Sequence, residues 1–151
     1  MLLSQLLTPQ RIRVPLLAAD KQAALHALVE AAAEGNDAAV DDLYAAIEER
    51  EAVLSTGVGH GVAIPHGRSG QVGHLLVSAG VVPTAIEYGS LDGLPVRLLF
   101  LLVGPESEAG LHVKALSRIT RLVRQPLVRE RLLATTSGDE FHRVLREAEG
   151  P

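Results

Sequence analysis

The segment Ser55-Thr-Gly-Val-Gly-His-Gly-Val-Ala-Ile-Pro-His66 joins three alternating glycines to a short apolar run and a Pro-His pair. The glycines let the backbone adopt positive φ or approach a ligand closely. The run Val62–Ile64 has the pattern of a short buried strand. Pro65 fixes its own φ and keeps the preceding residue extended. The sequence therefore predicts that His66 leaves the end of a buried strand in a defined direction, which suits a nucleophile.

Two helices and an edge strand are expected before this segment. Arg11–Leu16 alternates enough to form a short edge strand. Asp20 is a typical N-cap for a helix that Gly35 ends, and Asp37 is a typical N-cap for a second helix. The second helix places Arg50 in or just past its C-terminal turn.

Two strands and three helices are expected after it. The strands cover roughly residues 74–82 and 96–103, and the second is apolar on both faces and therefore central. A helix follows with His112 in its first turn, and Pro126 starts another that runs to Leu133. Residues 137–140 have a capping-box pattern before a terminal helix. This order predicts an α/β (α+β) fold, with a mixed β-sheet flanked by helices on both faces.

Composition limits the class of protein. The chain has 151 residues, of which 47% are hydrophobic and 21% charged, so we expect residues 1–151 to form a single domain. The apolar run Leu98–Val103 is too short to cross a bilayer, and the first residues lack the basic region of a secretory signal. We therefore expect no direct membrane insertion. The absence of cysteine excludes disulfides and thiol nucleophiles.

The charge of the chain argues against nucleic-acid binding. The net charge is −4 and only 3% of the residues are aromatic, so neither a basic footprint nor stacking platforms are present in quantity. One basic cluster, Arg118, Arg121 and Arg124, follows helical spacing. Such a stripe is typical of a solvated helix face, and a docking surface for an acidic partner is the alternative.

Other site motifs do not fit. The glycine spacing differs from G-x-G-x-x-G and leads into a strand, and no Walker A lysine follows. The spacing of His60, His66 and His74 matches no standard zinc pattern. We therefore expect no cofactor and no metal.

Four segments in order carry a family resemblance: the glycine motif continued by Gly67-Arg68, then Leu91–Val96, Leu98–Pro105 and Gly110–Leu116. Together they resemble the phosphotransferase system (PTS) enzyme IIA domains of type 2, the fructose/mannitol and nitrogen-regulatory family. The resemblance implies a cytoplasmic phosphotransferase component that carries phosphate on one histidine.

The resemblance implies roles for three side chains. His66 is the phosphorylated nucleophile, His112 donates a hydrogen bond to the phosphoryl group, and Arg50 clamps it. Arg68 lies just beyond His66 and competes with Arg50 for the clamp.

The glycine segment is expected to supply further phosphate donors, because backbone N–H groups in such turns form anion-binding nests. The expected contacts are Ser55, Thr56, Gly57, Gly59, His60 and Gly61.

The implied function is that of a phosphocarrier. His66 would accept the phosphoryl group from an HPr-like histidine phosphocarrier protein. The nitrogen-regulatory branch is favoured because the chain reads as one complete domain, and its partner would then be a regulated target protein. The alternatives are a sugar-specific IIA, which passes phosphate to a IIB domain, and a non-catalytic binding module of the same fold. We expect an exposed apolar docking rim at Val58, Val62 and the loop after Gly67.

Overall fold

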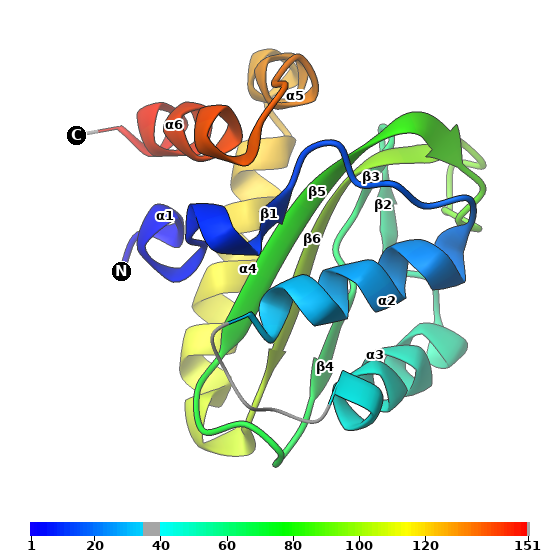
Figure 1. The fold of residues 1–151 in the computed structure, drawn as a ribbon, viewed down its shortest axis with the longest axis vertical. Helices are drawn as coiled ribbons and strands as arrows, with labels where there is room; N and C mark the ends of the chain where they lie inside the picture. The colour runs from blue at the N-terminus through cyan, green and yellow to red at the C-terminus, as the bar shows by residue number, and fades with distance from the viewer. Residues whose placement is uncertain (35–39, 151) are drawn as a thin grey trace.

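The computed structural model describes residues 1–34 and 40–150. Its elements follow the chain as six helices, two 3₁₀ turns and six strands within the described residues (Figure 1). The helices are α1 (Leu3–Leu6), α2 (Lys21–Ala32), α3 (Val40–Val53), α4 (Ala109–Val123), α5 (Pro126–Leu133) and α6 (Gly138–Glu149). The strands are β1 (Ile12–Arg13), β2 (Gly57–Gly59), β3 (Val62–Ala63), β4 (His66–Arg68), β5 (Leu76–Ile86) and β6 (Val96–Gly104). The 3₁₀ turns are η1 (Pro9–Arg11) and η2 (Glu106–Glu108).

The six strands form one mixed sheet. Its order is β1-β5-β6-β3-β2, and β4 also pairs with β6. Strands β5 and β6 are antiparallel, whereas β3 and β4 both run parallel to β6. Strand β6 is central and buried along nearly its whole length, as its two-sided apolar pattern predicts.

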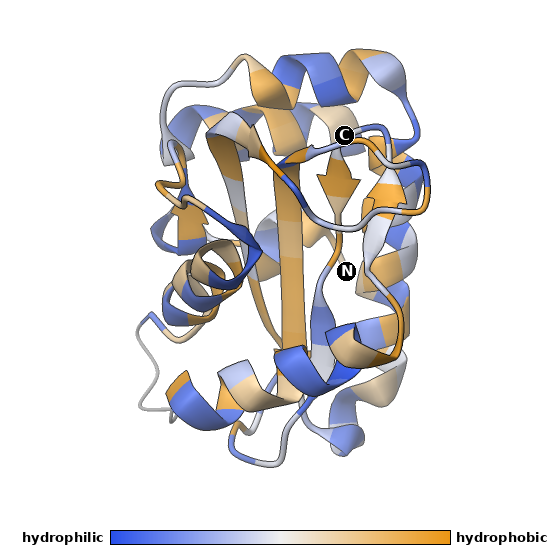
Figure 2. Ribbon diagram, turned by 90° about the vertical axis from the view of Figure 1, so that its right-hand side faces the viewer, coloured by the Kyte–Doolittle hydropathy of each residue, from blue (hydrophilic) through white to orange (hydrophobic). Residues whose placement is uncertain are grey.

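Helices cover both faces of this sheet and enclose a hydrophobic core on each. Helices α2 and α3 cover one face, and α1, α4, α5 and α6 lie on the other (Figure 1). The hydropathy colouring shows apolar central strands between helices that are polar on their outer sides (Figure 2). The predicted α/β architecture, with a mixed sheet between helical layers, is confirmed.

Several helix ends follow the predicted capping. The Asp20 side chain accepts a hydrogen bond from the Ala23 amide, and Ser137 accepts one from the Glu140 amide. Helix α5 covers the predicted residues, and Arg50 lies in the last turn of α3. The predictions that Gly35 ends one helix and Asp37 caps the next lie outside the described residues.

The strands around His66 differ from the prediction. His66 begins the short strand β4 and does not leave a strand end. The chain continues past Pro65 alongside β6, because the Pro65 carbonyl accepts a hydrogen bond from Leu102. The glycine segment adds strand β2, which is antiparallel to β3. The edge strand β1 is only two residues long.

Candidate functional site

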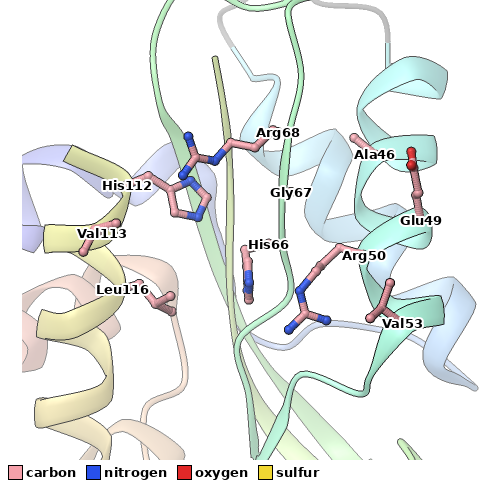
Figure 3. Close-up of a pocket in the computed structure, with 10 residues that line it drawn as sticks. All are labelled: Ala46, Glu49, Arg50, Val53, His66, Gly67, Arg68, His112, Val113 and Leu116. Atoms are coloured by element: carbon pink, nitrogen blue, oxygen red, sulfur yellow. The ribbon is translucent and has the colours of Figure 1, made fainter. Parts of the chain in front are cut away.

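A cavity of about 520 Å³ lies between α3, β4 and α4. Its walls carry four basic or imidazole side chains, one carboxylate and several small or apolar residues (Figure 3). The lining residues are Ala46, Glu49, Arg50, Val53, His66, Gly67, Arg68, His112, Val113 and Leu116. The structure therefore brings Arg50 and His112, which lie far apart in the sequence, to the same cavity as His66 and Arg68.

Gly67 allows α3 to approach the sheet closely enough to form this cavity. A Cβ atom at Gly67 would lie 2.9 Å from the carbonyl oxygen of Ala46, which belongs to the backbone of α3. Backbone cannot move aside as a side chain can, so only glycine fits here. Because His66 and Arg68 flank Gly67 on β4, the alternation of a strand places their side chains on one face.

The tautomer of His66 follows from its hydrogen bond. Its Nδ1 atom lies 2.9 Å from the carbonyl oxygen of Ile64. A carbonyl can only accept, so Nδ1 carries the proton and Nε2 keeps its lone pair. His66 is half-buried at the cavity wall. The backbone therefore orients the imidazole with Nε2 as its nucleophilic atom.

His112 lies in the first turn of α4, as predicted, and is 4% exposed. Burial, with smaller contributions from the charges of Arg68 and His66, lowers the pKa of His112 to about 4. His112 is therefore neutral at pH 7. Its Nδ1 atom is buried and has no hydrogen-bond partner among the described residues. With the proton on Nε2, the ring presents a donor without adding a charge.

The two arginines of the cavity are held differently. Arg50 donates to the carbonyl oxygen of Leu54 at 2.7 Å, which leaves its positive charge without a carboxylate partner among the described residues. Arg68 donates to the carboxylate of Glu106 at 3.2 Å. That carboxylate is 86% exposed, so the pair is weak and exchangeable. Both residues line the cavity, so their positive charges can stabilise an anion there.

A buried polar network fixes the end of α3 next to Arg50. The Glu51 carboxylate, whose side chain is 5% exposed, accepts from Lys21 at 2.9 Å and from the Tyr88 hydroxyl at 2.9 Å. The Thr56 hydroxyl also donates to Glu51. Burial raises the pKa of Tyr88, so its hydroxyl stays protonated. These contacts hold the last turn of α3 in place, and with it the backbone of Arg50.

The glycine segment does not line this cavity. The Ser55 hydroxyl donates to the Tyr88 carbonyl and accepts from the Gly57 amide, and Thr56 belongs to the Glu51 network. The turn has positive φ at Gly59, His60 and Gly61, and the Asp92 carboxylate accepts from the His60 amide. The structure thus uses the predicted phosphate-contacting residues Ser55, Thr56, Gly57, Gly59, His60 and Gly61 to build a hairpin.

The predicted docking rim also needs correction. Val62 is 2% exposed because it packs in the core, so it cannot contact a partner. Val58 is exposed but lines a different cavity, beside His60. The exposed apolar residues at the His66 cavity are Val53 and Val113.

Sequence reasoning missed these two residues, although the spacing of Val53 contains a signal. Val53 follows Arg50 by three residues on α3, and Val113 directly follows His112 on α4. A helical residue three positions away shares the face of a site residue, which points to Val53, whereas a directly adjacent residue such as Val113 gives no such signal.

Similarity to known proteins extends over nearly the whole chain. Residues 5–148 match the family model described as phosphoenolpyruvate-dependent sugar phosphotransferase system, EIIA 2. A nitrogen regulatory protein of Bradyrhizobium diazoefficiens is 34% identical over 143 residues, covering 95% of this chain and 94% of that protein. A PTS system fructose-specific EIIA component of Haloferax volcanii is 33% identical over 132 residues, covering 85% and 84%.

The fold agrees with a solved structure of the same kind. The nitrogen regulatory protein IIA-Ntr from Neisseria meningitidis superimposes with a TM-score of 0.87 at 27% identity, covering 94% of this chain and 97% of that one. Within the part of the chain that the structure describes, no helix is both long and apolar enough to cross a membrane. The family match and the relatives together show that this chain belongs to the type 2 EIIA family of phosphoenolpyruvate-dependent phosphotransferase system components.

Proposed function

We propose that this protein is a phosphocarrier that accepts a phosphoryl group on Nε2 of His66 from an HPr-like histidine phosphocarrier protein. The observation that carries the proposal is the hydrogen bond from His66 Nδ1 to the Ile64 carbonyl. It frees Nε2 as a nucleophile beside a cavity that Arg50 and Arg68 also line. Membership of a family of phosphotransfer components supports the same reading.

The proposed step is an in-line displacement. The lone pair of His66 Nε2 forms the new N–P bond while the bond from phosphorus to the donor's histidine nitrogen breaks. The electron pair of that bond goes to the donor nitrogen, so a donor ring that carries a proton on its other nitrogen leaves as a neutral imidazole. The His66 ring then carries the positive charge, and no proton is gained or lost by either ring. The hydrogen bond to Ile64 then keeps Nδ1 protonated in the product.

The surrounding side chains stabilise phosphoryl charge. Arg50 and Arg68 supply guanidinium donors to the phosphoryl oxygens. His112 supplies a neutral N–H donor near the N-terminus of α4, where the helix dipole favours an anion. Because catalysis here is alignment and charge stabilisation, these residues need no covalent role.

Of the two branches of the family, nitrogen-regulatory and sugar-specific, we propose the first, in which the phosphorylation state of His66 controls binding to a target protein. The similarity to nitrogen regulatory proteins in sequence and in fold supports it. The fructose-specific relative supports the alternative, a sugar-specific carrier that passes the phosphoryl group to a IIB domain. A non-catalytic binding module is less consistent with the cavity, which keeps His66, Arg50 and His112 together.

The test is phosphorylation in a reconstituted system. The protein is incubated with phosphoenolpyruvate, enzyme I and the HPr-like carrier, and intact mass is measured before and after mild acid. We expect one acid-labile phosphoryl adduct, which peptide mapping assigns to His66. The absence of an adduct with several carriers would favour the binding module. Transfer from the adduct to IIB domains would favour the sugar branch.

A further inference from the structure

The outer face of α4 is strongly basic in an otherwise acidic chain. Residues 109–125 contain four lysines and arginines and no aspartate or glutamate, whereas the whole chain has a net charge of −4. The cations are Lys114, Arg118, Arg121 and Arg124. Arg118 lies 3.8 Å from the Glu149 carboxylate, but within the described ranges no carboxylate pairs with the other three. Most of this charge is therefore open to a partner.

This basic face adjoins the His66 cavity. Lys114, Arg118 and Arg121 line a surface hollow of about 450 Å³ that shares Val113 with the His66 cavity. Arg121 follows His112 by nine residues, so it lies about 14 Å further along the helix. A protein interface of standard size buries about 800 Å² on each partner, which is wide enough to cover this distance.

The opposite wall of the cavity, formed by α3, carries exposed negative charges. Glu49 lines the cavity from α3, and Asp42 precedes it by seven residues, which places both on one face of that helix. Both are exposed. Figure 3 shows α3 and α4 on opposite sides of His66. Apart from Arg50, whose side chain points toward His66 (Figure 3), the cavity mouth is therefore acidic along α3 and basic along α4, and each helix adds one exposed apolar residue, Val53 and Val113.

We propose that the protein that exchanges a phosphoryl group with His66 docks in one orientation, with acidic groups over Lys114 and Arg121 and basic groups over Asp42 and Glu49. This proposal rests on the proposed function, because a partner in phosphoryl transfer must cover the cavity mouth. Opposite charges on the two rims fix the rotation of the partner about His66 and speed encounter. A nucleic acid or an anionic membrane fits less well, since either would face the carboxylates of α3.

The experiment reverses each rim separately. The variants are Lys114→Glu/Arg121→Glu on α4 and Asp42→Lys/Glu49→Lys on α3. Arg143→Glu/Arg146→Glu on α6 is the matched control, since both residues are exposed and the change in net charge equals that of the α4 variant. The second-order rate of transfer from the phosphorylated HPr-like carrier of the same genome is divided by the rate of labelling with phosphoramidate. Labelling with phosphoramidate needs no docked partner, so dividing by its rate corrects for any damage that a substitution does to the His66 site. This correction matters for Glu49, which lines the cavity.

We expect the ratio to fall about tenfold or more in both rim variants at low salt, and to change less than twofold in the control. We also expect added salt to slow transfer to the wild type more than transfer to either rim variant. A ratio that falls for one rim variant and rises for the other would show that the partner's docking face carries charge of a single sign, and it would overturn the proposal. A ratio that is unchanged in either rim variant would also overturn the proposal. The single variant Asp42→Lys tests the α3 rim again with a residue that does not line the cavity.

Two further outcomes separate this proposal from the proposed function. If phosphoramidate labels His66 but the carrier transfers nothing to it, His66 is supported as the nucleophile and the docking proposal is contradicted. Failure of both donors would remove the proposed function, and the docking proposal with it. Binding of the wild type to phosphatidylglycerol vesicles that Lys114→Glu/Arg121→Glu abolishes would assign the basic face to a membrane instead.

Discussion

The imidazole rings of His66 and His112 meet edge to face, with centroids 5.7 Å apart and planes at 74°. One ring comes from β4 and the other from the first turn of α4. The proposed transfer requires different things of the two rings, because His66 must expose a lone pair whereas His112 must offer an N–H group. The hydrogen bond to Ile64 settles the tautomer of His66, and the low pKa of His112 keeps that ring neutral. Two neutral imidazoles can therefore act as nucleophile and donor without repelling each other.

Replacing His66 by alanine should abolish phosphoryl uptake and leave the fold intact. The side chain is half-buried, and among the described residues its hydrogen-bond partner is the Ile64 carbonyl, so we expect a loss of about 1 kcal/mol in unfolding free energy at most. Intact mass after incubation with phosphorylated carrier measures the uptake, and urea unfolding measures the stability. His74→Ala, an exposed histidine outside the cavity, is the control. Undiminished labelling of the His66 variant would place the nucleophile elsewhere.

Replacing His112 by alanine should slow labelling without stopping it. Loss of one donor to the developing charge costs about 2.7 to 4 kcal/mol on the precedent of oxyanion holes, which corresponds to about 10²- to 10³-fold in rate. Single-turnover labelling by rapid quench measures this rate. A rate equal to that of the wild type would limit His112 to a structural role.

Replacing Arg50 by glutamine should slow labelling more than the same change at Arg68. Loss of a charged hydrogen bond costs about 1.5 to 3 kcal/mol, or roughly 10- to 100-fold in rate. Arg50 keeps its full charge because its observed partner is the Leu54 carbonyl, whereas the charge of Arg68 is partly neutralised by Glu106. Labelling rates of both variants with phosphoramidate test the order. The reverse order would make Arg68 the principal clamp.

Stability should fall as the pH drops from about 6.5 to about 4. In the folded protein the pKa of His112 is lowered to about 4, so between these values the unfolded chain binds a proton that the folded protein does not. Acid therefore favours unfolding in this window, and His112 adds no further pH dependence below it. The difference between urea unfolding of the wild type and of His112→Gln, measured across this range, isolates the contribution. Parallel curves for the two proteins would contradict the lowered pKa.

Much of the fold was predictable because its signals are local. Apolar periodicity and caps such as Asp20 and Ser137 depend on neighbouring residues, and they marked most of the helices. The two-sided apolar pattern likewise identified β6 as the central strand. Strand β4 escaped prediction because its three residues form a strand only by pairing with β6, a long-range contact.

The sequence predicted which three side chains lie together, but it did not predict the surroundings of the glycine segment. His66, His112 and Arg50 were named from the family resemblance, and the structure brings all three to one cavity. The glycine segment was expected at the phosphate because turns with positive φ form anion nests. Instead, its turn is satisfied by Asp92, which lies thirty-two residues further along the chain. No local pattern reveals such a partner.

Replacing Gly67 by alanine should damage the site through the backbone of α3. The new Cβ atom would lie 2.9 Å from the Ala46 carbonyl oxygen, so α3 must move away from β4 and carry Arg50 with it. Overpacking of this kind costs about 1 to 3 kcal/mol, and the displaced guanidinium should slow labelling of His66. Gly70→Ala is the matched control, because nothing lies within 4 Å of its added Cβ atom. Urea unfolding and phosphoramidate labelling test both effects. Wild-type stability and rate in the Gly67 variant would show that α3 yields without cost, and that the close approach at Gly67 does not position Arg50.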